Sequence, residues 1–207
     1  MAKEERSMLH YVHPHQRPQY RSLLDDYFRL RKTIFHDKLG WSVNVTGDME
    51  KDIYDTMDCL YILSTSADGE LLGGLRQMVT TGPTLTWEVF SDLVPDRTSI
   101  MSPRVWETTR FCISPSASHL KFNSGLNRVS IELSLGALEY GIEQGVTRHI
   151  AVCERTVFEL SRSLRMPSEI LGSRIEPNGS EILCVAWEVS EESAARLKWV
   201  GSMAQVA

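Results

Sequence analysis

The sequence has few cysteines, none of them close to another, and it has no long apolar run. Its four cysteines form no Cys-x-x-Cys motif and no Cys/His cluster at metal-ligand spacing, and they stand at Cys59, Cys112, Cys153 and Cys184. This spacing argues against a zinc site, so we expect reduced, buried thiols in a cytoplasmic protein without a bound metal. No apolar segment approaches the length that crosses a bilayer, which predicts a protein without a membrane span.

Positive charge is also in short supply. The chain has 22 Lys and Arg against 27 Asp and Glu, a formal net charge of −5. That balance argues against a nucleic-acid-binding protein, which depends on an overall positive field. With 207 residues, 42% of them hydrophobic, the chain fits one domain over 1–207. The first ten residues lack the apolar core of a signal peptide, and we expect 1–7 to be a disordered tail.

The hydrophobic pattern alternates between strand and helix periods along the chain. Strands are predicted over 8–12, 104–113, 147–153 and 181–189, and a hairpin is predicted around the Asp68-Gly69 turn. Helices are predicted over 19–35, 123–145 and 156–164, with a short one near 85–94 and an irregular loop over 41–57. This order indicates an α/β or α+β fold with helices on both faces of a central sheet.

Two charged residues interrupt the predicted strand RVWETTRFCI. Glu107 and Arg110 are three residues apart, so an unbroken strand sends their side chains to opposite faces of the sheet. A charge in a sheet interior is costly unless it is paired. We therefore expect Glu107 to face a functional cleft. Arg110 shares that cleft only if a β-bulge interrupts the strand, and otherwise it braces the layer behind.

Other charged or aromatic residues also lie in or beside predicted buried elements. Arg31 falls in the apolar stripe of the first helix, and Arg76 shares a strand face with apolar residues. Each has a plain structural explanation, a snorkelling side chain for Arg31 and a solvated edge strand for Arg76. Asp55 and Asp58 could simply be turn or cap residues, for which aspartate is a common choice. Trp41 could be ordinary core, as most tryptophans are. Together these residues predict a shared cleft in which opposite charges pair.

An ordered series of segments resembles one known family. The segments are FRLRKTIF, LGW, YDTMD, GGLRQMVTTGPT, VFSDL and WETTRF, and they are dense from about residue 28 to 114. Their order and spacing are similar to those of the acyl-homoserine-lactone synthases, the LuxI-type autoinducer synthases. The resemblance implies a three-layer α-β-α sandwich around a mixed, mostly antiparallel sheet, as in the GCN5-related N-acetyltransferases. It also implies a quorum-sensing enzyme that joins an acyl thioester to S-adenosylmethionine and releases methylthioadenosine.

The resemblance also implies roles for particular residues. Glu107 would be the base that takes a proton from the amine of S-adenosylmethionine, and Arg110 would stabilise the oxyanion of the thioester. The S-adenosylmethionine site and its scaffold would consist of Arg31, Phe35, Trp41, Asp55, Asp58 and Arg76. The chain departs from the family at Ile53, where a glutamate is common. S-adenosylmethionine is a substrate in this reaction, so no cofactor is expected.

The donor side of the reaction rests on fewer residues. Weak candidates for an acyl pocket are Met78, Phe90, Leu133, Leu138, Val152 and Cys153, and plain core is the better explanation for Met78, Leu133, Leu138 and Val152. Family members that prefer 3-oxo chains have a threonine near the position of Cys153, so the cysteine suggests an unsubstituted chain. The donor would be an acyl carrier protein or coenzyme A thioester. A carrier protein is acidic, and Lys121, Arg128, Arg148 and Arg155 could dock it, although nearby acids make an ordinary solvated surface equally plausible. A separate receptor would read the product.

Two other functions are weighed against this one. An N-acyltransferase of the same fold could use acyl-coenzyme A and a different amine, but the chain lacks the Q/R-x-x-G-x-G/A pyrophosphate loop of such enzymes. A non-catalytic relative could bind S-adenosylmethionine as a sensor, and the intact Glu107 argues against that reading.

Overall fold

The structure is a computed structural model that describes residues 7–94, 96–121 and 126–205. The strands are β1 (Met8–Val12), β2 (Val45–Thr46), β3 (Met49–Glu50), β4 (Leu60–Thr65), β5 (Leu71–Val79), β6 (Val105–Ile113), β7 (Arg148–Glu154), β8 (Ser168–Ile175) and β9 (Glu181–Glu188). The α-helices are α1 (Arg21–Arg31), α2 (Leu85–Glu88), α3 (Arg128–Glu143), α4 (Arg155–Arg162) and α5 (Glu191–Gln205). Short 3-10 turns and a π-helical turn connect these elements.

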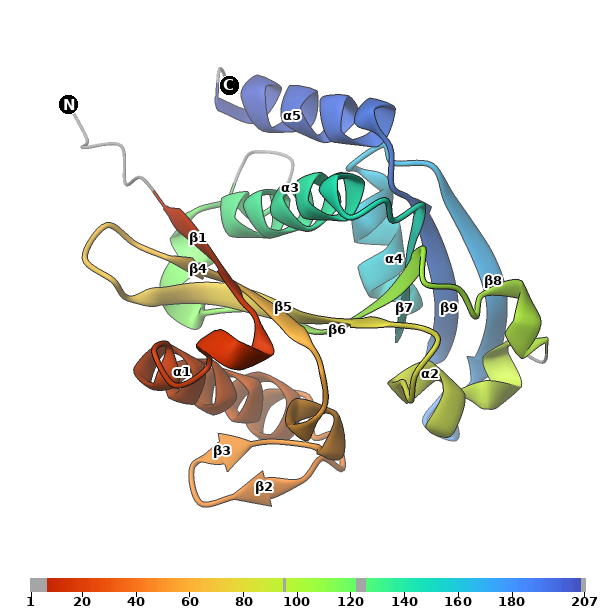
Figure 1. The fold of residues 1–207 in the computed structure, drawn as a ribbon, viewed down its shortest axis with the longest axis horizontal. Helices are drawn as coiled ribbons and strands as arrows, with labels where there is room; N and C mark the ends of the chain where they lie inside the picture. Colours follow the sequence, from red (N-terminus) through yellow and green to blue (C-terminus); the bar gives the residue numbers. More distant parts are fainter. Residues whose placement is uncertain (1–6, 95, 122–125, 206–207) are drawn as a thin grey trace.

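Seven of the strands form one sheet in the order β1-β4-β5-β6-β7-β9-β8. Every neighbouring pair is antiparallel except β6 and β7, which are parallel. The pairing of β6 with β7 runs only from Val105–Arg148 to Glu107–Ile150. Beyond Glu107 the two strands diverge, and the sheet opens at this point into two groups of strands (Figure 1).

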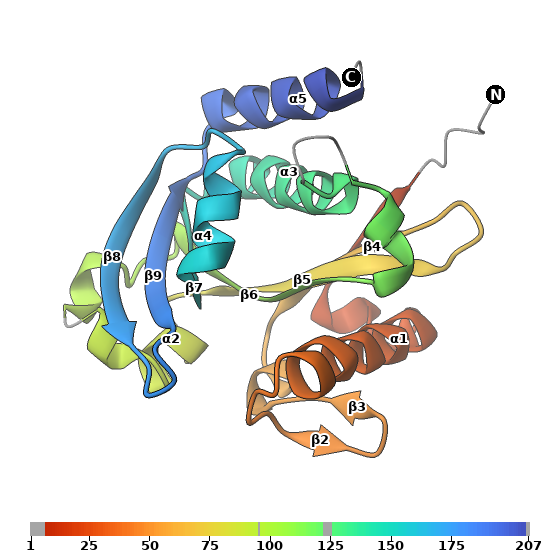
Figure 2. The ribbon, with the colours of Figure 1, turned by 180° about the vertical axis from the view of Figure 1, so that it is seen from behind.

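Helices cover both faces of the sheet, as Figures 1 and 2 show from opposite sides. The helix α1, the small β2–β3 hairpin and α2 lie on one face, while α3, α4 and α5 lie on the other. The expected three-layer sandwich around a mixed, mostly antiparallel sheet is therefore confirmed. Among the described residues, no helix is both long and apolar enough to cross a membrane.

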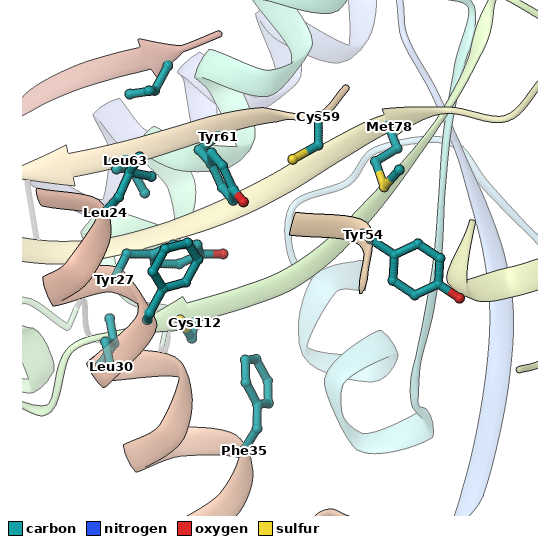
Figure 3. Packing of buried hydrophobic residues seen from close by; sticks show 12 residues of the cluster. Leu24, Tyr27, Leu30, Phe35, Tyr54, Cys59, Tyr61, Leu63, Met78 and Cys112 are labelled. Atoms are coloured by element: carbon teal, nitrogen blue, oxygen red, sulfur yellow. The ribbon is translucent and has the colours of Figure 1, made fainter. Parts of the chain in front are cut away.

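The core on the α1 face is rich in aromatic rings. Tyr27 and Phe28 of α1 pack edge-on against Tyr61 of β4, with ring centroids 5.9 and 6.0 Å from that of Tyr61. Figure 3 shows the rings of Tyr27 and Tyr61 between the helix and the sheet, with Met78 and Tyr54 farther along towards α2. Burying such rings stabilises the packing of α1 against β4 and β5. The helix is thereby held where its last turn faces the diverging strands.

Most of the predicted elements are present, with boundaries shifted by a few residues. The first helix continues beyond α1 as a π-helical turn over Lys32–Lys38, and Gly145 follows α3 with φ of 71°, as expected of a helix-ending glycine. The sequence did not predict β8 or α5, and the loop expected over 41–57 contains the β2–β3 hairpin and a 3-10 turn over Ile53–Thr56. The tail expected over 1–7 lies outside the described residues except for Ser7.

Candidate active site

The strand β6 contains the irregularity that the sequence requires if Glu107 and Arg110 are to share a face. Arg76 of β5 pairs with Thr109, but Gly74 pairs with Cys112, so the register of β6 shifts by one residue between them. Arg110 lies within this bulge with φ of 55°, a left-handed conformation that is uncommon for a residue with a side chain. The hydroxyl of Tyr27 donates to the Arg110 carbonyl at 2.7 Å and helps to hold it. The bulge turns Arg110 to the α1 face, where Glu107 also lies.

Arg31 is the first of three arginines that meet on this face. Its side chain is 0% exposed, which excludes the snorkelling explanation. Its Nε donates to Glu50 at 2.5 Å, and its Nη1 and Nη2 donate to the two oxygens of Asp55 at 2.8 and 2.9 Å. This two-pronged pairing uses the planar shape of the guanidinium and fixes the orientation of both groups.

Arg76 joins the same cluster from the sheet. It is also 0% exposed and lies on β5, between β4 and β6, so the edge-strand explanation is wrong. Its Nη1 and Nη2 donate to Asp52 at 2.5 and 3.0 Å, and its Nη1 donates to Asp55 at 2.8 Å. Its Nε donates to the Thr109 hydroxyl at 3.0 Å. All three nitrogens of this guanidinium therefore have partners in the site.

Arg110 completes the cluster from the bulge. Its Nη2 lies 3.1 Å from Glu50 and 3.0 Å from Asp52, and its side chain is 9% exposed. Its guanidinium lies over the Phe35 ring, 5.5 Å from the centroid. The three arginines and the three carboxylates of Glu50, Asp52 and Asp55 form a closed network with no net charge.

The pKa values of Asp55 and Arg76 agree with ionised side chains in this network. Burial tends to raise the pKa of the Asp55 carboxyl, but hydrogen bonds and charge from Arg31 and Arg76 outweigh burial and hold it well below its usual range. Burial likewise tends to lower the pKa of Arg76, while Asp52 and Asp55 raise it above its ordinary value. Because each buried charge has opposite charges beside it, the cost of burying the group is offset.

Glu107 lies on the same face but outside the network. It is 1% exposed, and its two oxygens accept hydrogen bonds from the backbone N–H groups of Leu85 at 3.0 Å and Thr86 at 2.6 Å. These are the first two N–H groups of α2, so Glu107 occupies the place that the side chain of Thr84 would take as helix cap. The Thr84 hydroxyl is buried without a hydrogen-bond partner among the described residues.

Burial has a measurable consequence for Glu107. It raises the pKa of the carboxyl above the ordinary value, and the N–H groups of Thr86 and Leu85 oppose this only in part. Tyr54 connects α2 to the network. Its hydroxyl donates to Glu88 of α2 at 2.7 Å, and the Arg76 guanidinium lies 5.4 Å from the centroid of its ring.

Phe35 and Trp41 form an aromatic pair beside Arg110. Their rings are stacked, with centroids 5.2 Å apart and planes inclined by 22°. Phe35 is 5% exposed, whereas Trp41 is 39% exposed and is therefore not ordinary core. An exposed aromatic face next to a charged network is suited to contact a ligand cation.

The carboxylates that pair with the three arginines differ from those that the sequence suggested. Asp55 is central, but Asp58 is exposed, and within the described parts of the chain it takes no part in the ion-pair network. Sequence reasoning missed Glu50 and Asp52, whose carboxylates supply the remaining negative charge. A signal was present in the segment MEKDIYD, where three acids precede the buried strand β4, but its polar character gives no helical or strand period from which to read their direction.

The residues suggested for an acyl pocket are not gathered in one place. Phe90 and Val152 belong to one apolar cluster on the Glu107 face, together with Trp87, Leu93 and Ile150. Met78 lies in the neighbouring cluster beneath α1. The other three lie on the opposite face of the sheet: Leu133 and Leu138 belong to α3, where Leu133 packs on the sheet and Leu138 packs towards α5, and Cys153 lies beside α4.

Three of the four cations suggested for carrier docking lie beside acids of the chain. Arg128 pairs with Glu132 at 2.8 Å, Arg148 lies 3.9 Å from Glu169, and Arg155 pairs with Glu181. Lys121 is exposed beside an isolated bridge to Asn127. These contacts match the ordinary solvated surface that the sequence also allowed.

Comparison with known sequences gives a consistent result. A family model described as autoinducer synthase matches residues 15–197. The chain is 29% identical over 180 residues to an acyl-homoserine-lactone synthase of Rhizobium etli, and the match covers 86% of this chain and 82% of the relative.

Comparison with solved structures extends this to the fold. MesI, described as a CoA-dependent acyl-homoserine lactone synthase, is 27% identical with a TM-score of 0.81, and the match covers 94% of this chain and 95% of MesI. BjaI, solved with SAM and isopentyl-CoA, has a TM-score of 0.83 at 22% identity, covering 95% of this chain and 90% of BjaI. A protein described as an N-acetyltransferase from Lactobacillus plantarum shares the fold with a TM-score of 0.56 at 16% identity, covering 89% of this chain and 99% of that protein.

Proposed function

This chain belongs to the autoinducer synthase family and is an acyltransferase, and from that premise we propose that it transfers an acyl group from a thioester to the amine of S-adenosylmethionine and closes the product to an acyl-homoserine lactone. The observation that carries the proposal is the neutral network of three arginines and three carboxylates on the same face as the buried Glu107. Such a network can orient a zwitterionic substrate without a net charge of its own.

The S-adenosylmethionine site follows from this arrangement. The proposed site uses the network of Arg31, Arg76 and Arg110 as its base and the exposed Trp41 as the wall for the sulfonium. Asp52 and Glu50 take the place that the sequence gave to Asp58, because they lie within hydrogen-bond distance of the three arginines.

Glu107 is the proposed base for acyl transfer. The ammonium of S-adenosylmethionine gives up one proton to the carboxylate, directly or through water, and the amine nitrogen then attacks the thioester carbonyl. As the tetrahedral intermediate collapses, the nitrogen gives up a second proton to the departing thiolate, so the carrier leaves as its free thiol and an amide bond replaces the carbon–sulfur bond. The oxyanion between these steps would be stabilised by Arg110 or by backbone N–H groups of the bulged strand.

Lactone closure needs less from the protein. A carboxylate oxygen of the acylated substrate attacks its γ-carbon, and the bond from that carbon to the sulfonium breaks to release neutral methylthioadenosine. The positively charged sulfur is already a good leaving group, so the protein contributes mainly by holding the two reacting atoms close.

The divergence of β6 and β7 supports a location for the acyl chain. The thioester carbonyl must come close to Glu107, and the strands separate immediately beyond that residue. The apolar cluster that contains Phe90 and Val152 lies on the same face and offers an apolar wall. Leu133 and Leu138 are better explained as core, because they belong to α3 and pack against the sheet and towards α5.

The reaction can be tested directly. The purified protein would be incubated with S-adenosylmethionine and a panel of acyl donors of different chain length, and mass spectrometry would follow methylthioadenosine and the acyl-homoserine lactones. We expect both products to appear together with at least one donor. Absence of methylthioadenosine with every donor would overturn the proposal and favour a binding protein.

The carrier of the acyl group is a separate question within the same panel. Acyl carrier protein is the donor that the family resemblance favours, whereas the description of MesI favours acyl-coenzyme A. The pairing of Arg128 and Arg155 with glutamates gives no added support to a basic docking surface. Each acyl chain would therefore be offered on both carriers, and the ratio of kcat/KM values decides between them.

The chemistry of the acyl chain can be read from the same products. In the proposed complex the acyl chain passes between the diverging strands β6 and β7 to the α4 side of the sheet, where Cys153 lies. The family resemblance implies a threonine near this position in members that prefer 3-oxo chains, and a thiol is a much weaker hydrogen-bond donor than a hydroxyl. We expect unsubstituted acyl chains to be preferred. A product profile dominated by 3-oxo lactones would contradict this.

A further inference from the structure

Arg17 lies behind the ion-pair network and makes an unusual set of contacts. It belongs to the connection between β1 and α1, and its side chain is partly buried. Its Nη1 donates to the Asp55 carbonyl at 2.9 Å, and its Nη2 donates to the carbonyls of Met57 at 2.8 Å and Cys59 at 3.2 Å. The Cys59 Sγ accepts from the same Nη2 at 3.0 Å. One guanidinium thus gathers the carbonyls of three alternate residues.

The partners of Arg17 distinguish it from the other arginines of the site. Arg31, Arg76 and Arg110 each pair with carboxylates, but among the described residues no carboxylate lies within ion-pair distance of Arg17. Its contacts fall at the end of the 3-10 turn over Ile53–Thr56, where carbonyl groups have no partner within the turn. A cation at the end of such a turn is favourable and sets the path of the chain that follows.

Two routes lead from Arg17 to the same carboxylate. The first is the backbone of Asp55, whose carbonyl faces Arg17 while its carboxylate receives hydrogen bonds from Arg31 and Arg76. The second is Tyr61, whose ring lies 5.4 Å from the Arg17 guanidinium and whose hydroxyl donates to Asp55 at 2.8 Å. Asp55 is thus held from behind by both its main chain and a neighbouring ring.

We propose that Arg17 is a positioning residue for S-adenosylmethionine binding, because it fixes the turn that presents Asp55 to Arg31 and Arg76. The inference rests on the proposed function, since S-adenosylmethionine is the ligand that the network would orient. Asp55 uses both oxygens to accept from Arg31, so a small shift of its backbone would break the pairing. A lysine cannot replace Arg17, because an ammonium is not the planar fork that reaches three carbonyls at once.

The test compares Arg17→Gln and Arg17→Lys with the parent and with Arg29→Gln as matched control. Arg29 is also an arginine of the α1 layer, but it is exposed and pairs with Asp26 and Asp48 away from the network. Titration calorimetry would give the affinity for S-adenosylmethionine, and steady-state kinetics would give kcat and KM. We expect both Arg17 variants to weaken binding and raise KM at least about tenfold while kcat at saturation falls by less than about threefold. The control should match the parent.

A second measurement separates positioning from general stability. Amide hydrogen exchange of peptides that cover 52–60 should be faster in both Arg17 variants, while exchange in β6 and α3 stays as in the parent. Added guanidinium ion should restore part of the affinity of Arg17→Ala and not that of Arg17→Lys, whose ammonium occupies the space. Unchanged affinity in Arg17→Gln, or parent-like behaviour of Arg17→Lys, would overturn the inference. A parent protein without affinity for S-adenosylmethionine would overturn the proposed function instead, while the exchange data would still report on the turn.

Discussion

At the scale of single residues, Glu107 combines two demands that pull in different directions. Its carboxylate accepts two backbone N–H bonds that favour the charged form, while burial favours the neutral form and prevails. A base for acyl transfer must be charged before it can accept a proton. Because its pKa is raised, Glu107 becomes protonated earlier as the pH falls. Acidification should therefore abolish activity at a higher pH than it would with an ordinary glutamate as base.

Replacement of this carboxylate tests its role as base. We expect Glu107→Gln to lower kcat by about a hundredfold or more, because general base catalysis is worth that much, while the affinity for S-adenosylmethionine changes little. In the parent, kcat/KM should fall as pH falls through a pKa above 4.5, the ordinary value for glutamate. Steady-state kinetics across pH and calorimetry measure both quantities. Equal losses in turnover and binding would contradict the assignment.

The acids of the network give a contrast between neighbours. Asp52→Asn removes a carboxylate that pairs with Arg76 and Arg110, and we expect it to weaken S-adenosylmethionine binding at least about tenfold and to cost roughly 3 kcal/mol of stability. Asp58→Asn changes an exposed residue outside the network, and both quantities should stay near those of the parent. Calorimetry and thermal melting decide the matter. Equal effects of the two variants would show that Asp58 has a role that the network does not explain.

At the scale of elements, close packing of α1 on β5 supports the bulge in β6. A Cβ added at Gly74 would lie 2.6 Å from Leu63 Cδ2 and 2.9 Å from Tyr27 Cε2, far closer than side-chain atoms approach. The Tyr27 ring cannot simply rotate away, because its hydroxyl is bonded to the Arg110 carbonyl. Gly74 therefore allows the close approach of α1, at the point where the register of β5 and β6 shifts.

A methyl group at position 74 should disturb both the packing of α1 and the proposed S-adenosylmethionine site. We expect Gly74→Ala to lower stability by about 1 to 3 kcal/mol, the usual cost of overpacking, and to weaken S-adenosylmethionine binding because Tyr27 and the bulge move together. Gly82→Ala is the control, since the nearest atom to its Cβ is 4.0 Å away. Chemical denaturation and calorimetry would be compared for the two. Parent-like binding in a destabilised Gly74→Ala protein would show that Tyr27 and Arg110 are not coupled.

The same scale shows why sequence reasoning succeeded in some elements and failed in others. The helix α3 was predicted from its apolar periodicity, and β4 and β5 were predicted from two apolar runs on either side of the Asp68-Gly69 turn. The edge strand β8 is largely exposed and has no buried face to produce an alternation. Glu50 and Asp52 lie in a short hairpin and a turn, where direction is set by tertiary contacts with α1 and β5 rather than by local pattern. The bulge could be stated only as a condition, because one strand does not reveal its partner's register.

At the scale of the whole molecule, a buried histidine between the two groups of strands makes the stability of the fold depend on pH. His149 of β7 lies on the α3 face, 6% exposed, with its Nε2 3.1 Å from the amide of Gln77. Burial lowers its pKa to about 4. The folded protein therefore keeps this ring neutral at a pH where the unfolded chain would already protonate it.

This difference predicts the direction of the pH dependence of stability. Between about pH 6.5 and pH 4 the unfolded chain binds the extra proton, so the free energy of unfolding falls as the pH falls, by up to roughly 3 kcal/mol. Glu107 has the opposite sign, since its raised pKa favours the protonated folded state. Urea denaturation at several pH values would be compared for the parent and His149→Gln. We expect a shallower fall in the variant, and equal slopes would exclude His149 as the cause.

The short parallel pairing of β6 and β7 has a consequence for how this protein could diversify. The strands β1, β4, β5 and β6 all come from residues 8–113, and β7, β9 and β8 all come from residues 148–188. Among the described residues, the two groups are joined within the sheet by the three register pairs from Val105–Arg148 to Glu107–Ile150. A single genetic crossover between codons 114 and 127 would exchange the second group together with α3 and leave the strand pairings inside each group intact. Recombination between relatives can therefore replace β7, β8 and β9 while the arginine network is inherited unchanged.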